Sequence, residues 1–241
     1  PSVVTLDARA VIGSYRDAVR SHTSPEAALG LFANPSLVQL ARANAIEVGG
    51  NGPYYAIARD SFALARGPGR YAFEHAATGN ALYRVDETGL NVAERIGALE
   101  SPRLWRRYVI AAALLCLSAV LLVGKSGVSV GSRIASWLPI GILLCLVMQT
   151  LVLFAGYAAG RSFVFDLLAG RSQRPAALVA LGDLMLIGVV ATSIAAIAAW
   201  RFRFWGSGRR GLAMRAHFSI IAGASIGLAP ILYALNLIGL P

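Results

Sequence analysis

Charged residues are scarce in this 241-residue sequence: only 14% are Asp, Glu, Lys or Arg, whereas soluble domains carry about 25%. Lysine occurs once, at Lys125, and cysteine only at Cys116 and Cys145, both inside long apolar runs where a thiol behaves as a small apolar group. The three histidines and the scattered acids show no metal-ligand spacing, and the polar half contains no Gly-x-Ser-x-Gly nucleophile elbow. We therefore expect no disulfide framework, no metal site and no cofactor.

The whole chain is 56% hydrophobic, with a mean hydropathy of +0.62. Long apolar runs dominate its second half. About 20 apolar residues in a helix cross a bilayer core of about 30 Å. Four runs approach or exceed that length, at about 108–124, 137–159, 176–200 and 217–240. The sequence thus predicts an α+β membrane protein, in which a four-helix transmembrane bundle occupies residues 108–241.

Residues 1–100 have the pattern of a small, antiparallel, β-rich domain. Short alternating runs are separated by turn signals, of which 49–53 (GGNGP) and 86–89 (DETG) are the clearest. A strand is expected at 11–19 and a short helix at 24–31, behind the N-cap Ser24. The next segment, 101–107, is a tether in which Trp105, Arg106 and Arg107 form a membrane-interface pattern.

The positive charge is concentrated in the apolar half. Residues 1–107 carry a net charge of +2, whereas residues 108–241 carry +8, which favours lipid contact over nucleic-acid binding. The connector between the first two runs and the connector between the last two runs together carry seven Arg and Lys residues, with Arg215 just beyond the latter included. The connector between the second and third runs carries three. The positive-inside rule then places the β domain and the C-terminus outside the bacterial cytoplasmic membrane.

Several side chains in the apolar half are candidates for a specific role. Besides Trp105, Arg106 and Arg107, the amphipathic residues Trp137, Trp200 and Trp205 are expected to anchor the helices at the interface. Asp183, Arg215 and His217 are the polar candidates within the membrane. A structural ion pair with Arg174 is favoured over a transport role for Asp183, and snorkelling is favoured over ligand binding for Arg215 and His217.

Two further sequence features bear on helix packing. The patterns Gly156-x-x-x-Gly160 and Gly223-x-x-x-Gly227 permit close helix approach, and Pro230 is expected to kink the fourth helix.

The order of the pieces resembles the C-terminal region of membrane-anchored serine hydrolases related to class C β-lactamases and penicillin-binding proteins. Residues 12–16 (IGSYR) and 20–24 (RSHTS) resemble the opening of the β domain that follows the catalytic domain in that family, and 70–74 (RYAFE) and 81–89 (ALYRVDETG) resemble its closing strands. A Trp-bearing tether and several membrane helices then follow, as Trp105 and the apolar runs do here.

The resemblance implies a parent enzyme but carries over no catalytic position. Such hydrolases use a Ser-x-x-Lys nucleophile, and Leu122 stands three residues before the only lysine, Lys125. The chain, which begins at Pro1 without a methionine, is then expected to be a non-catalytic anchor whose catalytic domain lies upstream in the same polypeptide. The alternatives are a stand-alone membrane protein whose outer β domain senses or binds a partner, or a small transporter built on Asp183, Arg215 and His217.

Overall fold

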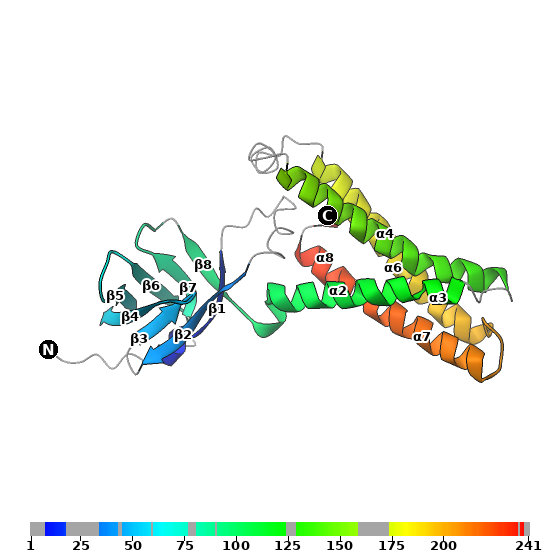
Figure 1. Cartoon of the computed structure of the whole chain (residues 1–241), viewed down its shortest axis with the longest axis horizontal. Coiled ribbons are helices and arrows are strands. Elements are labelled where there is room, and N and C mark those ends of the chain that lie inside the picture. The colour runs from blue at the N-terminus through cyan, green and yellow to red at the C-terminus, as the bar shows by residue number, and fades with distance from the viewer. Residues whose placement is uncertain are drawn as a thin grey trace. The chain divides into compact units, whose positions relative to one another are not determined.

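The computed structural model describes residues 8–17, 34–42, 45–58, 60–76, 81–89, 91–123, 129–158, 174–235 and 237–238 of the chain. The described residues form two compact units, one of strands and one of helices, and the chain passes from one to the other between Leu104 and Trp105 (Figure 1). That boundary lies inside the interval 101–107 for which a tether was predicted. Each unit has a hydrophobic core of its own.

Eight antiparallel strands form the first unit, and each pairs with its neighbours in sequence. The last strand pairs back onto the first, with Ser14 opposite Ile96, so the sheet closes into a barrel. The strands are β1 (Gly13–Asp17), β2 (Ser36–Arg42), β3 (Ala45–Val48), β4 (Asn51–Ala58), β5 (Ser61–Leu64), β6 (Arg70–His75), β7 (Ala81–Asp86) and β8 (Val92–Ile96), flanked by the 3-10 turns η1 (Ala8–Val11) and η2 (Ala98–Glu100). The prediction of a small antiparallel β domain is confirmed. Its closure, which leaves no unpaired strand edge, was not predicted.

Side chains fill the inside of the barrel. Tyr15 and Phe62 have no exposed surface, and both rings pack edge-on against Phe73, with centroids 5.8 and 5.6 Å away. The Tyr15 hydroxyl donates a hydrogen bond of 2.8 Å to the carbonyl of Val11, which satisfies its one buried polar group. An eight-stranded barrel is about wide enough for side chains to fill, and this barrel therefore has a packed core.

Some local expectations in the β domain need correction. The strand expected at 11–19 begins only at Gly13, because the chain up to Val11 forms η1. The turn expected at 49–53 is confined to Gly49 and Gly50, whose φ angles are 60° and 85°, and β4 already begins at Asn51. The helix expected at 24–31 lies outside the described residues.

The second unit consists of helices. The helices are α2 (Pro102–Ser118), α3 (Val120–Val123), α4 (Val130–Ala158), α6 (Arg174–Arg201), α7 (Arg209–Ile226) and α8 (Leu228–Ala234). α2 and α3 together form one membrane-length rod, whose helical structure is interrupted only at Ala119. α7 and α8 form another, interrupted only at Gly227. α4 and α6 run side by side along their length, and α6 also packs on α7 (Figure 1).

Four of these rods are long and apolar enough to cross a membrane: Pro102–Val123, Val130–Ala155, Ala177–Arg201 and Arg209–Ala234. They coincide with the four predicted runs, but three begin earlier, at Pro102, Val130 and Arg209. Pro102 occupies the first helical position of α2, where its fixed φ is suited to a helix and its missing N–H is not needed.

The last rod is interrupted one helical turn before Pro230, the residue that was expected to kink it. Proline removes one helical N–H and its ring collides with the carbonyl four residues earlier, which belongs here to Ile226. α7 ends at Ile226, and α8 begins at Leu228 after a one-residue interruption at Gly227.

Candidate functional site

Arg215 is buried in the helix bundle, where it holds the connection between α6 and α7. Its side chain is 6% exposed, and its Nη1 donates hydrogen bonds to the carbonyls of Gly206 (2.5 Å) and Phe204 (3.4 Å). Its guanidinium carbon lies 5.3 Å from the centroid of the Trp200 ring, within cation–π range. That Arg215 snorkels to the interface stays a prediction, and the structure shows that its Nη1 is already engaged by carbonyls of the connection.

The backbone of this connection explains why it needs an internal donor. Arg203, Trp205 and Gly206 all have left-handed φ angles of 49°, 63° and 89°. Such residues cannot continue helical hydrogen bonding, so nearby carbonyls must find other donors. Trp205 itself is only 6% exposed and packs against Phe218 with a ring separation of 5.5 Å.

His217 joins α7 to the end of α2. Its Nε2 lies 3.0 Å from the hydroxyl oxygen of Ser118, and that hydroxyl in turn donates to the carbonyl of Leu115 at 2.5 Å. Because the single hydroxyl proton goes to Leu115, the oxygen can only accept from His217. The histidine must then carry its proton on Nε2, and its role here is an inter-helix hydrogen bond.

Asp183 lies half-buried on α6, seven residues into the span Ala177–Arg201. It is about 25 Å along the helix from Trp200, against which Arg215 packs. The structure therefore does not bring Asp183 together with Arg215 into one polar site. The side chain of Arg174, the partner expected for Asp183, lies outside the described residues.

The predicted interface anchors differ in their exposure. Trp137 and Trp200 are 58% and 47% exposed on the outer surface of their helices, as an interfacial anchor requires. Trp105 instead packs against the core of the bundle, beside half-buried Arg106 and exposed Arg107. The interfacial role of these residues stays a prediction.

Tyr108 makes a close contact that the sequence did not reveal. Its hydroxyl donates to the carbonyl of Ala224 at 2.8 Å, in the last turn of α7. A Cβ built on Gly227 would overlap the Tyr108 hydroxyl, whereas one on Gly223 would meet nothing within 4 Å. Only the second glycine of this Gly-x-x-x-Gly pattern therefore serves close packing.

The same segment, 223–227 (GASIG), also matches the Gly-x-Ser-x-Gly pattern, but its context is wrong for a nucleophile. Ser225 is fully buried in a membrane-length helix, and its hydroxyl donates to the carbonyl of Ile221 at 2.9 Å. A nucleophile elbow requires a strand, a sharp turn and a helix, with the hydroxyl exposed.

Gln149 on α4 is a second polar residue that joins two helices. It is 2% exposed, its Nε2 donates to the carbonyl of Leu178 on α6 at 3.0 Å, and its Oε1 has no partner among the described residues. The neighbouring Gly182 is equally constrained, since a Cβ there would overlap the carbonyl oxygen of Leu237. A cavity of about 290 Å³ between α2, α4 and α8 is lined in part by Gln149.

Inside the barrel, Arg84 is held by aromatic rings. Its guanidinium carbon lies 5.0 Å from the ring centroid of Tyr71 and 5.7 Å from that of Tyr15, and its Nη1 donates to the hydroxyl of Ser36 at 2.7 Å. Burial raises the pKa of Tyr15 to about 12, although Arg95 and Arg84 oppose the rise. The arrangement is that of a half-buried cation packed among aromatic rings, and the raised pKa keeps Tyr15 protonated near neutral pH.

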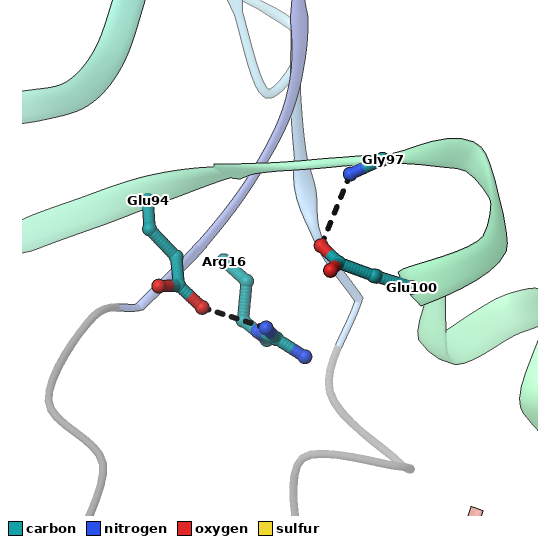
Figure 2. A network of polar contacts seen from close by, with 4 residues as sticks. All are labelled: Arg16, Glu94, Gly97 and Glu100. Carbon is teal, nitrogen blue, oxygen red and sulfur yellow. Dashed lines mark hydrogen bonds and ion pairs between the residues drawn. The ribbon is translucent and has the colours of Figure 1, made fainter. Parts of the chain in front are cut away.

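An ion pair joins the first and last strands of the barrel. Arg16 Nη2 and Glu94 Oε1 are 2.6 Å apart, and the two side chains are 15% and 29% exposed (Figure 2). Just beyond β8, the Glu100 carboxylate accepts a hydrogen bond of 3.2 Å from the backbone N–H of Gly97, which fixes the turn that leads to α2. Elsewhere in the barrel, His75 Nε2 and Asp60 Oδ1 lie 3.0 Å apart. Within the described parts of the chain, no group of three or more metal-binding side chains is arranged around one point.

Comparison of the chain with protein-family models, with curated proteins and with solved structures finds no match.

Proposed function

We propose that this chain is a non-catalytic membrane anchor: a small β-barrel domain carried by a four-helix bundle that lies in the bacterial cytoplasmic membrane. The observation that carries the proposal is the apolar outer surface of the helices. Large side chains such as Leu114, Leu121, Ile187 and Ile197 are 62–72% exposed, although they are strongly apolar. Contiguous surfaces of this kind are found against lipid or a partner, because water solvates them poorly.

The cargo of the anchor, in this proposal, is a serine hydrolase of the peptidoglycan, β-lactam or ester type, encoded upstream in the same polypeptide. This finer statement is supported by the sequence resemblance alone. The interior of the barrel is packed with Tyr15, Phe62 and Phe73 and leaves little space for a substrate. Such a barrel is compatible with a structural role beside a separate catalytic domain. The anchor would concentrate the enzyme near the cell wall.

The orientation proposed for the anchor places the barrel outside the cell. It is supported by the arginine count of the connectors, which favours a cytoplasmic location for the start of α4, where Arg133 lies, and for the connection that holds Arg203. Because Arg215 is hydrogen-bonded inside the bundle, it contributes less to this count than an exposed arginine would. Labelling single cysteines introduced at Ser207 and Thr88 with a membrane-impermeant maleimide tests the orientation, and labelling of only position 88 is expected.

Cell fractionation tests the anchor and its cargo together. Cells that express the complete reading frame should hold nitrocefin- or ester-hydrolysing activity in the carbonate-resistant membrane fraction. Truncation after Ser101 should release that activity into the soluble fraction. A reading frame without a Ser-x-x-Lys domain, or an activity that stays in the membrane after truncation, would refute the proposal.

One observation favours the second candidate, a stand-alone protein whose barrel binds a partner. The outside of the barrel displays Leu37, Tyr55, Ile57 and Leu82 with 39–58% of their surface exposed. A native translation start near Pro1, combined with capture of an extracytoplasmic protein that is lost on Ile57→Lys, would favour this candidate over the enzyme anchor.

A further inference from the structure

A groove of about 810 Å³ runs along α4 and α6 on the outer surface of the bundle. One wall is a stripe of α4 residues that recur every three or four positions from Val130 to Cys145, and the other is a similar stripe on α6 from Leu184 to Ala191. The groove opens outward, because the large apolar side chains along it are 55–64% exposed: Ile134, Trp137, Leu144, Leu184 and Ile187.

Small residues keep the groove hollow. A Cβ built on Gly141, which lines the groove on α4, would meet nothing within 4 Å. On α6, Gly188 allows the two helices to approach closely, since a Cβ there would lie 2.9 Å from the side chain of Ile142. The space beside Gly141 is therefore free for an occupant from outside the chain.

The length of the groove matches one leaflet of a bilayer. From Val130 to Cys145, α4 rises about 22 Å. Half of a bilayer, with its headgroup region, is about 20–22 Å thick. Because Val130 is the first residue of α4, the groove extends from one end of the helix to about the depth of the membrane midplane.

The end of the groove at Val130 is basic. Arg133 lines it, is exposed, and forms no ion pair with any described residue. A Cβ built on Gly131 would overlap the ring of Phe204, so the start of α4 adjoins the connection after α6. That connection and its flanks carry four further exposed arginines: Arg201, Arg203, Arg209 and Arg210.

The described helices carry no acidic group at this end. Asp183 is the only acidic residue among them. A Cβ built on the preceding residue, Gly182, would lie 3.2 Å from the Gln149 side chain. Asp183 is therefore near the level of Gln149, about 24 Å along α4 from Arg133. An apolar groove that ends in a cluster of positive charge fits an amphipathic anion.

We propose that this groove binds an anionic diacyl glycerophospholipid. The phosphate lies against Arg133, and the indole of Trp137, one turn further along α4, lies at the level of the ester groups. One acyl chain follows the groove beside Gly141. The second chain stays in the surrounding bilayer, so the groove has to hold only part of the lipid.

Charge complementarity selects this occupant over a second copy of the chain. A symmetric dimer in a membrane places identical ends at the same level, which would bring two arginine clusters together. The inference rests on the membrane location in the proposed function and does not depend on an attached hydrolase.

Titration of defined lipids into the purified full chain in detergent, followed by native mass spectrometry, tests the proposal. The probes are dioleoylphosphatidylglycerol, dioleoylphosphatidylcholine, which has the same chains and no net charge, and glycerol 1-phosphate, which has no chains. One phosphatidylglycerol per chain should bind saturably and at least about fivefold more tightly than phosphatidylcholine, as one arginine near an anionic lipid implies. Excess glycerol 1-phosphate should not displace it.

Two substitutions separate the acyl chain from the headgroup. Gly141→Leu places a side chain in the groove and should abolish saturable binding of both lipids, whereas Gly223→Leu, at an exposed glycine of α7 outside the groove, should not. Arg133→Gln should lower affinity for phosphatidylglycerol about fivefold and leave that for phosphatidylcholine unchanged. Arg107→Gln is its matched control, because Arg107 is exposed and does not line the groove.

Equal affinity for the two lipids, displacement by glycerol 1-phosphate, or binding that never saturates would overturn the proposal. A dimer that Gly141→Leu dissociates would overturn it too, because the groove would then hold a second copy. If Gly141→Leu fails to fold, the lipid series and Arg133→Gln decide the question. A chain that resists carbonate extraction from membranes but shows no lipid preference refutes this inference alone, whereas a chain recovered in the soluble fraction refutes the proposed anchor.

Discussion

Replacing Gly227 with alanine tests how tightly α2 packs against the break between α7 and α8. The φ angle of Gly227 is −67°, so the backbone accepts any residue, and the only obstacle is the overlap of the new methyl group with the Tyr108 hydroxyl. Overpacking of this kind costs about 1–3 kcal/mol. Displacing Tyr108 also weakens its hydrogen bond to the Ala224 carbonyl, which is worth about 0.6 kcal/mol in a membrane protein.

The helix propensity of alanine acts in the opposite direction. Alanine is favoured over glycine by up to about 1 kcal/mol in a helix, so Gly227→Ala should destabilise the bundle by about 1–2 kcal/mol in total. Gly223→Ala is the matched control from the same Gly-x-x-x-Gly pattern, because its methyl group meets nothing within 4 Å. It should be neutral or stabilising by up to about 1 kcal/mol.

Unfolding in mixed detergent and sodium dodecyl sulfate, followed by tryptophan fluorescence, measures these differences. Tyr108→Phe removes the atom that the new methyl group meets first, so the double variant with Gly227→Ala should lose less stability than the sum of the two single changes. Equal effects of alanine at 223 and 227, or strict additivity with Tyr108→Phe, would refute the packing that we describe.

Three further predictions concern charged groups. Reversing one charge of the Arg16–Glu94 pair should destabilise the barrel, and the double reversal should recover a coupling energy of about 1 kcal/mol in a urea-unfolding cycle on the full chain; no coupling would show that the pair contributes nothing. Hydrogen bonds from Thr88, and then Asn91, lower the pKa of Asp86 from 3.8 to about 2. The stability that they give the β7–β8 hairpin should therefore be complete above pH 3.8 and disappear as the pH falls through about 2, and a carboxyl NMR titration with an unshifted midpoint would contradict this. Arg215→Met leaves the Gly206 carbonyl without its charged donor and should cost about 2–3 kcal/mol, seen as a lower thermal midpoint in detergent, whereas an unchanged midpoint would count against the buried contact.

The elements that the sequence predicted well are those with a strong period. Apolar runs of membrane length gave all four rods, and turn signals near ten-residue spacing gave the meander of β6, β7 and β8. Pro230 also located the break in the last rod, because the geometric effect of proline is local. Closure of the barrel could not be predicted, since the pairing of Ser14 with Ile96 joins strands more than 80 residues apart and leaves no periodic signal.

The polar residues of the bundle were harder to interpret from sequence. Arg215 near the start of an apolar run has the pattern of a snorkelling side chain, and only the left-handed backbone at 203–206 reveals that it faces inward. Gly182 and Gly227 are equally hidden, because a glycine that packs against a carbonyl or a hydroxyl looks the same in sequence as Gly223, which packs against nothing. What decides these roles is the partner from another helix, which a single sequence does not specify.

These contacts share one physical cause, the need to satisfy backbone carbonyls where water is excluded. At two places in the described part of the bundle where regular hydrogen bonding is interrupted, a long side chain from elsewhere supplies a donor. Tyr108 donates to the last turn of α7, and Arg215 donates to the connection after α6. Most of the polar groups that first suggest function in this bundle are therefore structural, as the high cost of an unpaired carbonyl in hydrocarbon requires. Gln149 follows this rule with its nitrogen, which donates to the Leu178 carbonyl of the neighbouring helix, while its oxygen has no donor among the described residues. The same reasoning gives Arg215 and His217 structural roles, because each makes its hydrogen bond to another segment of the bundle.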